Sequence, residues 1–158
     1  MTAVMPVLDG IAFLRRSLPP LMARVGLDLA EVLVVDDGCT DGSATYAAEL
    51  GARILATSGR VGPAAARNLG VAQCTTPLVL FVDADVVLHG DAVGRARRAL
   101  ADPSWTAVFG SYDDHPTDPG FFSRWKNLQH HAVHQRSGGL SSTFWSGCGA
   151  VRRSAFLD

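Results

Sequence analysis

Lysine is nearly absent from this chain of 158 residues: Lys126 is the only one, although arginine is frequent. A mechanism that needs a lysine at a defined place in a site therefore has one residue to draw on. The formal net charge of −1 gives no general attraction for nucleic acid or for anionic lipid. We therefore expect no nucleic-acid partner.

Long hydrophobic runs are also lacking. No apolar stretch approaches the ~20 residues that a membrane-spanning helix needs. The first ten residues contain Pro6, Asp9 and Gly10 and no basic segment, which is unlike a secretory signal peptide. These features predict a cytoplasmic protein, although an anchor could exist outside this chain.

Cysteine is scarce as well. Cys39, Cys74 and Cys148 lie far apart, in no spacing typical of a metal site. A reduced, cytoplasmic protein is the simplest interpretation. With 47% hydrophobic and 18% charged residues, the composition is that of a globular protein, and the length suffices for one domain with a buried core.

What the sequence does contain is a regular alternation of apolar strands with helices. The expected strands are residues 2–7, 31–36, 53–56, 78–82 and 106–109. The expected helices are residues 11–25 with a kink at Pro19-Pro20, residues 40–50, a helix that opens at Gly62-Pro63, and residues 91–101. This alternation predicts an α/β fold with parallel strand pairing.

The character of the chain changes after Gly110. A polar loop rich in turn-forming residues precedes an expected helix over residues 121–136. Ser137-Gly138-Gly139 predicts a flexible break. Residues 144–151 then predict a strand whose glycines allow close approach of a ligand or another backbone segment.

Acidic pairs follow two of the apolar strands. Asp83 and Asp85 come after the run Leu78–Val82, and Asp36 and Asp37 close an earlier run. Because parallel strands direct their carboxyl ends to one sheet edge, we expect these side chains to line one polar pocket. A divalent cation or sugar hydroxyls would balance their charge. The plainer alternative, capping of the following turn, accounts for a single aspartate better than for a pair.

Four motifs stand in a fixed order along the chain: Met5-Pro6-Val7, Val34-Val35-Asp36-Asp37-Gly38-Cys39-Thr40-Asp41, Gly62-Pro63-Ala64-Ala65-Ala66-Arg67-Asn68-Leu69-Gly70 and Phe81-Val82-Asp83-Ala84-Asp85. Together they resemble the inverting family-2 glycosyltransferases of GT-A fold, which typically read P-x-x-N, V-D-D-G-S-x-D, G-x-x-x-A-R-N-x-G and D-x-D. Any one motif is weak, but four in register over the whole chain are specific. Residues 144–156 resemble the family's acceptor-side segment.

The resemblance implies a GT-A-like, Rossmann-type α/β/α sandwich with a mostly parallel sheet. It implies transfer of a sugar, with inversion, from a nucleotide-diphosphate sugar to a saccharide or lipid-linked acceptor, a UDP-sugar being the favoured donor. Mn²⁺ or Mg²⁺ would bridge the phosphates and act as a Lewis acid. In a single domain over residues 1–158, residues 1–110 would form the nucleotide-sugar-binding half and residues 111–158 the acceptor-side segment.

By the same resemblance, the nucleotide-sugar would contact Pro6, Val7, Leu8, Asp36, Asp37, Arg67, Asp83, Ala84 and Asp85. Asp85 is the candidate metal ligand, and Asp83 would share the metal environment or hold the ribose. Asp37, or its neighbour Asp36, would accept a hydrogen bond from the imide of a uracil- or thymine-type base. Arg67 would reach the base or the phosphates, with a solvent-facing arginine as the alternative. The acceptor would contact Trp145, Ser146 and Gly147.

Two positions depart from the family's pattern. Leu8-Asp9 stand where an aromatic residue and an asparagine are usual, so the wall of the base site would be apolar without π-stacking. Cys39 replaces the usual serine, which we expect to alter one turn hydrogen bond. Asp41 is expected to have a structural role in capping the next helix.

Inversion requires a general base that deprotonates the acceptor hydroxyl. The resemblance places this carboxylate beyond residues 144–156, and no matching motif occurs before Asp158. Asp113 and Asp114, on a loop near the expected site, are weaker candidates. We therefore expect this chain to be the donor-binding N-terminal part of a longer transferase. Residues 121–156 are most similar to transferases that work at a membrane, so peripheral contact with a cytoplasmic membrane face is a further expectation.

Other interpretations explain fewer of the motifs. Three histidines within one turn, at residues 130–134, suggest zinc, but no further ligand has zinc spacing, so a surface or acceptor-facing helix is favoured. A haloacid-dehalogenase-type phosphatase or a receiver-type signalling domain needs a lysine at a strand end, whereas Lys126 lies in an expected helix. A nucleotidyltransferase lacks its glycine-rich loop, and a dinucleotide-binding enzyme lacks G-x-G-x-x-G. A non-catalytic nucleotide-binding module stays open.

Overall fold

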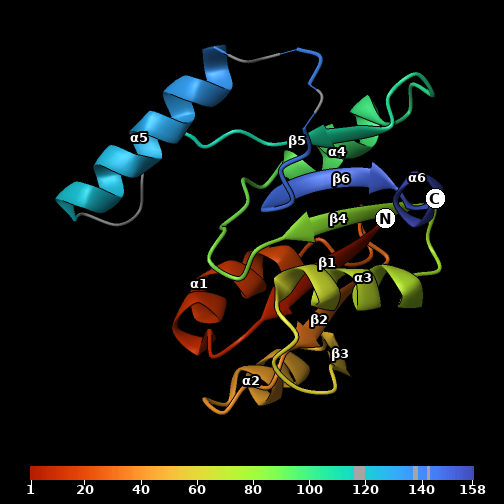
Figure 1. The fold of residues 1–158 in the computed structure, drawn as a ribbon, viewed down its shortest axis with the longest axis vertical. Coiled ribbons are helices and arrows are strands. Elements are labelled where there is room, and N and C mark those ends of the chain that lie inside the picture. Colours follow the sequence, from red (N-terminus) through yellow and green to blue (C-terminus); the bar gives the residue numbers. More distant parts are fainter. Residues whose placement is uncertain (116–119, 137–138, 142) are drawn as a thin grey trace.

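The computed structural model describes residues 1–115, 120–136, 139–141 and 143–158, which form a sheet covered by helices on both faces (Figure 1). The strands are β1 (Thr2–Val7), β2 (Glu31–Asp36), β3 (Arg53–Ala56), β4 (Leu78–Val82), β5 (Ala107–Phe109) and β6 (Cys148–Arg152). The helices are α1 (Ile11–Met22), α2 (Ser43–Glu49), α3 (Pro63–Gln73), α4 (Ala92–Ala99), α5 (Phe121–Arg136) and α6 (Arg153–Leu157). The predicted α/β architecture is confirmed.

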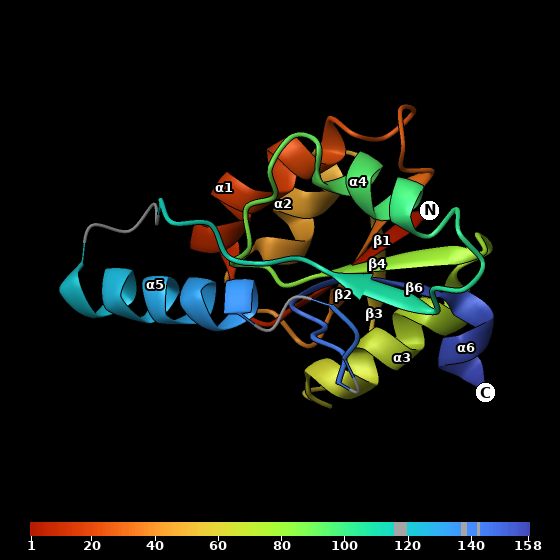
Figure 2. The same ribbon diagram turned by 90° about the horizontal axis from the view of Figure 1, so that it is seen from above.

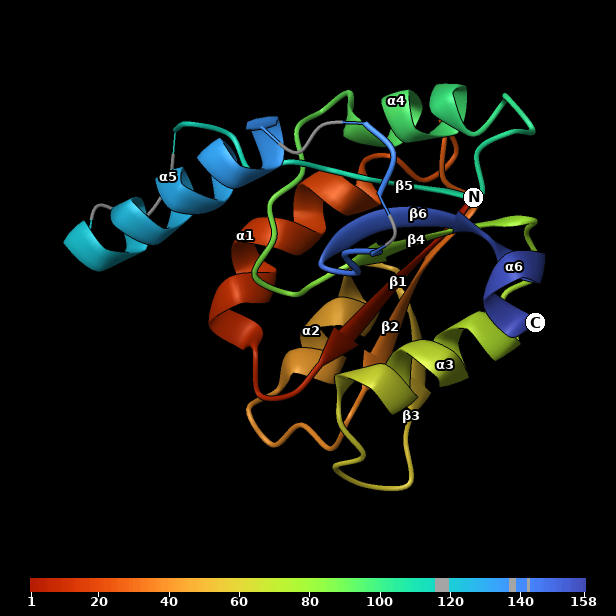
Figure 3. The same ribbon diagram turned by 45° about the horizontal axis from the view of Figure 1, so that its top comes forward.

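The sheet has six described strands in the order β3-β2-β1-β4-β6-β5. The first four are parallel to one another, as the alternation of strands and helices predicted (Figure 3). β6 runs antiparallel between β4 and β5. Parallel pairing is therefore wrong for the strand near residues 106–109, because a later strand returns through the sheet and becomes its neighbour.

Two further boundaries differ from the sequence prediction. The strand expected over residues 144–151 is β6, and residues 144–147 precede it outside regular structure. α1 continues through Pro19-Pro20. Both prolines are exposed, so water can reach the carbonyl groups that lose an N–H partner because proline has no N–H. The break expected at Ser137-Gly138 and the loop positions 116–119 lie outside the described residues.

The alternation of side chains along the strands produces two apolar layers (Figure 2). One layer lies between the sheet and helices α1, α2 and α4, and the other lies between the sheet and helices α3 and α6. On β1, Met5 belongs to the first layer and Val4 to the second, and both are fully buried. Burial on both faces explains why β1, β2 and β4 read as continuous apolar runs.

Helix α3 approaches the sheet closely at Gly70. A Cβ atom added there would lie 2.4 Å from Cγ1 of Val4 and 3.2 Å from Cγ2 of Val35. Both valines are fully buried and β-branched, so neither can move aside cheaply. The glycine therefore sets the distance between α3, which carries Arg67, and the sheet.

We predict that Gly70→Ala lowers the free energy of unfolding by about 1 to 2 kcal/mol, because overpacking outweighs the higher helix propensity of alanine. Urea unfolding followed by circular dichroism measures the change. Gly90→Ala is the matched control, since a Cβ there meets nothing within 4 Å. Equal stability of the two variants would show that α3 can shift without cost.

Candidate functional site

Parallel pairing brings the ends of three strands to one edge of the sheet. β1 pairs with β2 so that Val7 stands opposite Asp36, and the Asp37 N–H donates to the Val7 carbonyl at 2.9 Å. β4 flanks β1 on its other side. The two acidic pairs predicted from the sequence therefore lie at the same edge.

A cavity of about 280 Å³ opens at this edge. Its lining residues are Pro6, Leu8, Asp9, Gly10, Phe13, Pro63, Arg67, Asp83, Ala84 and Asp85. Six of the nine residues predicted to bind nucleotide-sugar are among them. Val7, Asp36 and Asp37 are not, because Val7 points into the core and the Asp36-Asp37 carboxylates are held by neighbouring loops.

Arg67 and Asp83 form an ion pair across this cavity. The Arg67 side chain is 14% exposed, so it is not the solvent-facing arginine considered as an alternative. Its Nε atom is buried and has no hydrogen-bond partner among the described residues. Arg67 thus keeps a donor available beside the carboxylate that it neutralises.

The turn that carries Asp83 and Asp85 is fixed by its backbone. The Val86 N–H donates to the Asp83 carbonyl at 3.0 Å, and the Ser17 hydroxyl of α1 donates to the Ala84 carbonyl at 2.6 Å. Within the described part of the chain, the Asp85 side chain makes no hydrogen bond or ion pair. Its carboxylate is therefore available to a ligand. A carboxylate that capped the turn would already accept a hydrogen bond from the backbone.

The two aspartates are suited to a hard divalent cation, since both supply carboxylate oxygens. No group of three or more histidine, cysteine or acidic side chains is placed to hold a metal within the described residues. Asp83 and Asp85 would hold a cation only together with oxygen atoms from a ligand such as a diphosphate. This arrangement fits Mn²⁺ or Mg²⁺ better than zinc.

Asp37 is buried, with 3% of its surface exposed, and its carboxylate accepts three hydrogen bonds. The donors are the Thr57 hydroxyl at 2.9 Å, the Val61 N–H at 2.9 Å and the Gly62 N–H at 2.8 Å. The bond from Val61, with those from Thr57 and Gly62, outweighs burial and lowers the pKa of Asp37 below its ordinary value of 3.8. The carboxylate therefore ties the end of β2 to the start of α3.

Asp36 and Asp41 stabilise the loop between β2 and α2. Asp36 accepts from the backbone N–H of Gly38 at 3.1 Å and of Cys39 at 2.7 Å. Asp41 accepts from the hydroxyl and N–H of Ser43, which begins α2, and from the Ile11 N–H at 2.8 Å. These bonds lower the pKa of Asp41. The structural role predicted for Asp41 agrees with these contacts.

Asp9 is a site residue whose role the sequence did not reveal. Its carboxylate accepts from the Thr40 N–H at 2.7 Å and pairs with Arg60 at 2.9 Å, which joins the loops after β1, β2 and β3. The bond from Thr40 lowers the pKa of Asp9. Asp9 has a φ of 49°, a left-handed conformation that aspartate tolerates better than most residues. In the sequence, only the departure of Leu8-Asp9 from the family's usual aromatic residue and asparagine could have indicated a role for Asp9.

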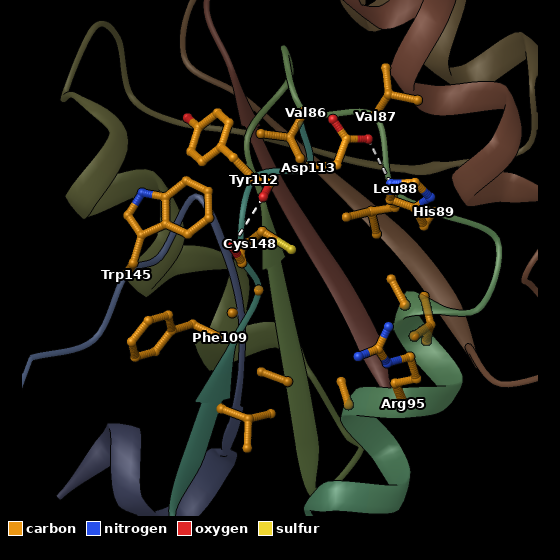
Figure 4. A pocket seen from close by; sticks show the side chains of 18 of the residues that line it. Val86, Val87, Leu88, His89, Arg95, Phe109, Tyr112, Asp113, Trp145 and Cys148 are labelled. Atoms are coloured by element: carbon orange, nitrogen blue, oxygen red, sulfur yellow. Dashed lines mark hydrogen bonds and ion pairs between the residues drawn. The ribbon is translucent and has the colours of Figure 1, made fainter. Parts of the chain in front are cut away.

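A second cavity of about 790 Å³ lies beyond Asp85, which borders both cavities (Figure 4). Its floor is mostly aliphatic and is formed by α4, β5, β6 and the segment after Asp85. Tyr112, Asp113 and Trp145 stand on its wall, and the rings of Tyr112 and Trp145 lie 5.2 Å apart. Of the predicted acceptor residues, Trp145 lines this cavity, whereas Ser146 and Gly147 are not among its lining residues.

Gly147 does not line the cavity but positions the Trp145 ring and the Asp83 backbone. A Cβ there would come within 2.5 Å of the Trp145 ring, so only glycine lets the ring lie in this place. The Gly147 carbonyl accepts the Asp83 N–H at 2.9 Å. The close backbone approach expected from the glycines is confirmed at this position.

The two candidate bases pair with histidines. Asp113 lies 2.8 Å from Nε2 of His89 and accepts the His115 N–H at 2.9 Å, and Asp114 lies 2.6 Å from Nδ1 of His115. Burial opposes ionisation of Asp113, but the bonds from His115 and His89 lower its pKa. A lowered pKa makes Asp113 a weaker proton acceptor.

The histidines of α5 face the wall of the larger cavity. Nδ1 of His131 lies 2.6 Å from the Tyr112 carbonyl, His130 stacks on the Tyr112 ring at 5.2 Å, and the His134 ring lies 5.4 Å from Trp145. Burial, with the nearby His130 and His131, lowers the pKa of His134. Ring packing and a carbonyl contact engage these side chains, while Nδ1 of His134 is buried without a partner among the described residues. The interpretation of this helix as a surface or acceptor-facing helix stays a prediction.

Residues 2–158 match the family described as Glycosyl transferase family 2. The pre-mycofactocin glycosyltransferase of Mycobacterium tuberculosis (strain ATCC 25618 / H37Rv) is 42% identical over 88 residues, covering 54% of this chain and 17% of that protein. Glycosyltransferase GlyA of Streptococcus pneumoniae is 28% identical over 125 residues, covering 77% of this chain and 18% of that protein.

Solved structures share the fold at low identity. The mannosyltransferase PcManGT of Pyrobaculum calidifontis, in complex with GDP-Man and Mn²⁺, has a TM-score of 0.75 and 23% identity over 99% of this chain and 45% of its own. The glucosyl-3-phosphoglycerate synthase of M. tuberculosis, with Mn²⁺ and UDP-Glc, has a TM-score of 0.72 and 22% identity over 97% of this chain and 56% of its own. The chain thus spans about half of these structures, and less of the curated relatives.

We predict that acid destabilises the fold partly through Asp37. A carboxylate with a lowered pKa contributes its stability above the unfolded pKa and loses it as the pH falls through the folded pKa. The free energy of unfolding should therefore decline from about pH 5 downward. Asp37→Asn should lower stability at pH 7 and flatten the decline, since its amide group would face an N–H donor.

Urea unfolding between pH 7 and pH 3 at fixed salt measures this dependence. Glu49→Gln, on the exposed side of α2, is the control and should follow the parent protein. If Asp37→Asn keeps both the stability and the pH dependence of the parent, the three donors do not hold the carboxylate as described.

Proposed function

The chain belongs to glycosyl transferase family 2, and from this premise we propose that it binds a nucleotide-diphosphate sugar for transfer of the sugar, with inversion, to a saccharide or lipid-linked acceptor. Residues 1–110 would bind the donor and residues 111–158 would face the acceptor. Sugar transfer would take place where the two cavities meet at Asp85.

The observation that carries this proposal is the pairing of opposite charges in the smaller cavity. Arg67, with its unpartnered Nε, is paired with Asp83 in the cavity that Asp85 also lines, and the Asp85 carboxylate makes no hydrogen bond or ion pair with the described residues. A diphosphate bound with a cation complements both sides, since its oxygens accept from the guanidinium and share a metal with the aspartates. A neutral ligand would leave this charge arrangement unused.

The cation would be Mn²⁺ or Mg²⁺, held by Asp85 and by Asp83. When bound, such a cation neutralises charge that develops on the departing diphosphate. The chain's own residues would orient that group: Arg67 donates to it from α3, and Ser17 and Gly147 hold the aspartate turn in place. Two of the similar structures carry Mn²⁺ with a nucleotide-sugar, which supports this assignment.

The base would lie at the ends of β1 and β2, against the side chains of Pro6 and Leu8 and the backbone at Val7, whose side chain is buried in the core. Leu8 is 44% exposed and offers an apolar surface to a base. Asp37 accepts one hydrogen bond at Oδ2, which leaves a lone pair for an imide N–H, with Asp36 as the neighbouring alternative. This chemistry favours a UDP-sugar.

The acceptor would enter the larger cavity, with the Trp145 ring as a platform and Ser146 and Gly147 as the support of that ring. The residues described contain no helix long and apolar enough to cross a membrane. We propose a cytoplasmic site of action, including the cytoplasmic face of a membrane when the acceptor is lipid-linked.

We predict that UDP binds with Mn²⁺ and that Asp85→Ala removes most of the metal-dependent affinity. Arg67→Ala should weaken binding by about 1.5–3 kcal/mol through loss of a charge-assisted contact. Titration calorimetry with UDP, GDP and TDP, with and without Mn²⁺, measures both effects. Asp91→Ala, which changes an exposed carboxylate outside the smaller cavity, should bind as the parent does. Equal binding by the parent, Asp83→Ala and Asp85→Ala would refute the assignment.

We also predict that residues 1–158 bind nucleotide but transfer sugar slowly or not at all, because the candidate bases Asp113 and Asp114 are paired with histidines. Radiolabelled donor hydrolysis and transfer would be compared with a protein extended at the C-terminus. Full turnover by residues 1–158 would contradict this and make Asp113→Asn and Asp114→Asn the next variants. A bound nucleotide without turnover in either protein would favour a non-catalytic nucleotide-binding module.

A further inference from the structure

Helix α5 turns its polar side to the protein. Asn127 donates to the Asp113 carbonyl at 2.8 Å, His131 contacts the Tyr112 carbonyl at 2.6 Å, and His134 packs on Trp145. Positions 127, 131 and 134 follow helical spacing, so they form one face. This face points inward, the reverse of the usual arrangement for a helix on a globular protein.

The opposite side of α5 faces solvent and carries four exposed apolar residues beside the polar Gln129 and Arg136. The exposed fractions are 75% for Phe121, 79% for Phe122, 54% for Trp125 and 53% for Val133. Figures 1 and 2 show α5 projecting from the body, with its N-terminal end, where the aromatic residues lie, farthest out. We call Phe121, Phe122, Trp125 and Val133 the outer face. Exposure of three large aromatic side chains within one and a half turns, with the Phe121 and Phe122 rings 5.4 Å apart, indicates an interaction site.

The charge of α5 is of one sign. The helix contains three basic residues, Arg124, Lys126 and Arg136, and none of the chain's 15 acidic residues. Arg124 and Lys126 lie on either side of Trp125 and are exposed. The partner must therefore accept large aromatic side chains and basic groups at the same place.

We propose that the outer face of α5 docks on the surface of an anionic lipid bilayer. Aromatic rings would enter the boundary between headgroups and acyl chains, while the basic side chains would contact lipid phosphates. This builds on the membrane-face part of the proposed function and names the surface responsible. Since a helix is about 10–12 Å across, it also places the cavity behind the polar side of α5 roughly one helix diameter from the bilayer surface.

A bilayer fits better than a protein groove or a second copy of this chain. A groove that buries Phe122 and Trp125 would also enclose Arg124 and Lys126, whose charges would need specific acidic partners. Long basic side chains can instead extend to the phosphate layer of a bilayer while the rings stay buried. Self-association remains a measurable alternative.

The test is co-sedimentation of the 158-residue chain with vesicles at physiological salt. One set contains equal parts phosphatidylcholine and phosphatidylglycerol, and the other contains phosphatidylcholine alone. We expect binding to the anionic vesicles. The double change Arg124→Gln with Lys126→Gln should weaken it by about thirtyfold, or roughly fivefold for each basic residue. Phe122→Ser with Trp125→Ser should weaken it by more than about tenfold.

Leu27→Ser is the matched control, since Leu27 is 69% exposed and lies far from α5 in the sequence. It should bind vesicles as the parent does. Absence of the parent from the anionic pellet would overturn the proposal, as would equal pelleting of the Phe122→Ser, Trp125→Ser protein. If light scattering shows that the outer-face variant loses a dimer instead, the partner is a second copy and the bilayer proposal fails.

Nucleotide binding separates this proposal from the proposed function. The outer-face variants should keep the parent's affinity for UDP with Mn²⁺, because none of the changed residues lines the smaller cavity. Vesicle binding without nucleotide binding would leave the docking surface standing and refute the donor site. Nucleotide binding without vesicle binding would support the donor site and refute the docking surface.

Discussion

Negative charge gathered at one edge of a parallel sheet is the constraint on which the rest of this structure depends. β1, β2 and β4 run in the same direction, so the aspartates that follow them meet. Carboxylates held close together and partly out of water are unfavourable unless donors or cations offset them. Most of the loops at this edge are shaped by that requirement.

Three of these carboxylates, those of Asp36, Asp37 and Asp41, accept backbone N–H donors, and two, those of Asp9 and Asp83, pair with an arginine. Asp37 receives N–H donors from the start of α3, and Asp41 receives them from the starts of α1 and α2. Asp83 takes Arg67. The Asp85 carboxylate, at the junction of the two cavities, has no hydrogen bond or ion pair with the described residues. Asp85 is therefore the aspartate at this edge with the most acceptor capacity left for a ligand.

Local patterns in the sequence were sufficient for the parallel half of the sheet. Apolar runs bounded by turn residues defined β1, β2, β3 and β4, and helical spacing defined α5 at its observed bounds. The place of β6 was not predictable in this way, because insertion between β4 and β5 depends on contacts between residues about 40 or more positions apart. The donors to Asp37 come from residues 57–62, a loop with no pattern that reveals its partner. The role of Asp9 likewise depends on Arg60, fifty-one positions away.

The walls of the two cavities are joined by a short route through the backbone. The Asp83 N–H donates to the Gly147 carbonyl, and Gly147 supports the Trp145 ring against Tyr112. Tyr112 in turn contacts His131 of α5 through its carbonyl. A shift of α5 at a surface would therefore reach the aspartate turn through packed rings and two hydrogen bonds, without any change in the sheet. Because Gly147 has no side chain that could take up such a movement, its carbonyl, which accepts the Asp83 N–H, is the point where a displacement of the Trp145 ring would alter the position of Asp83.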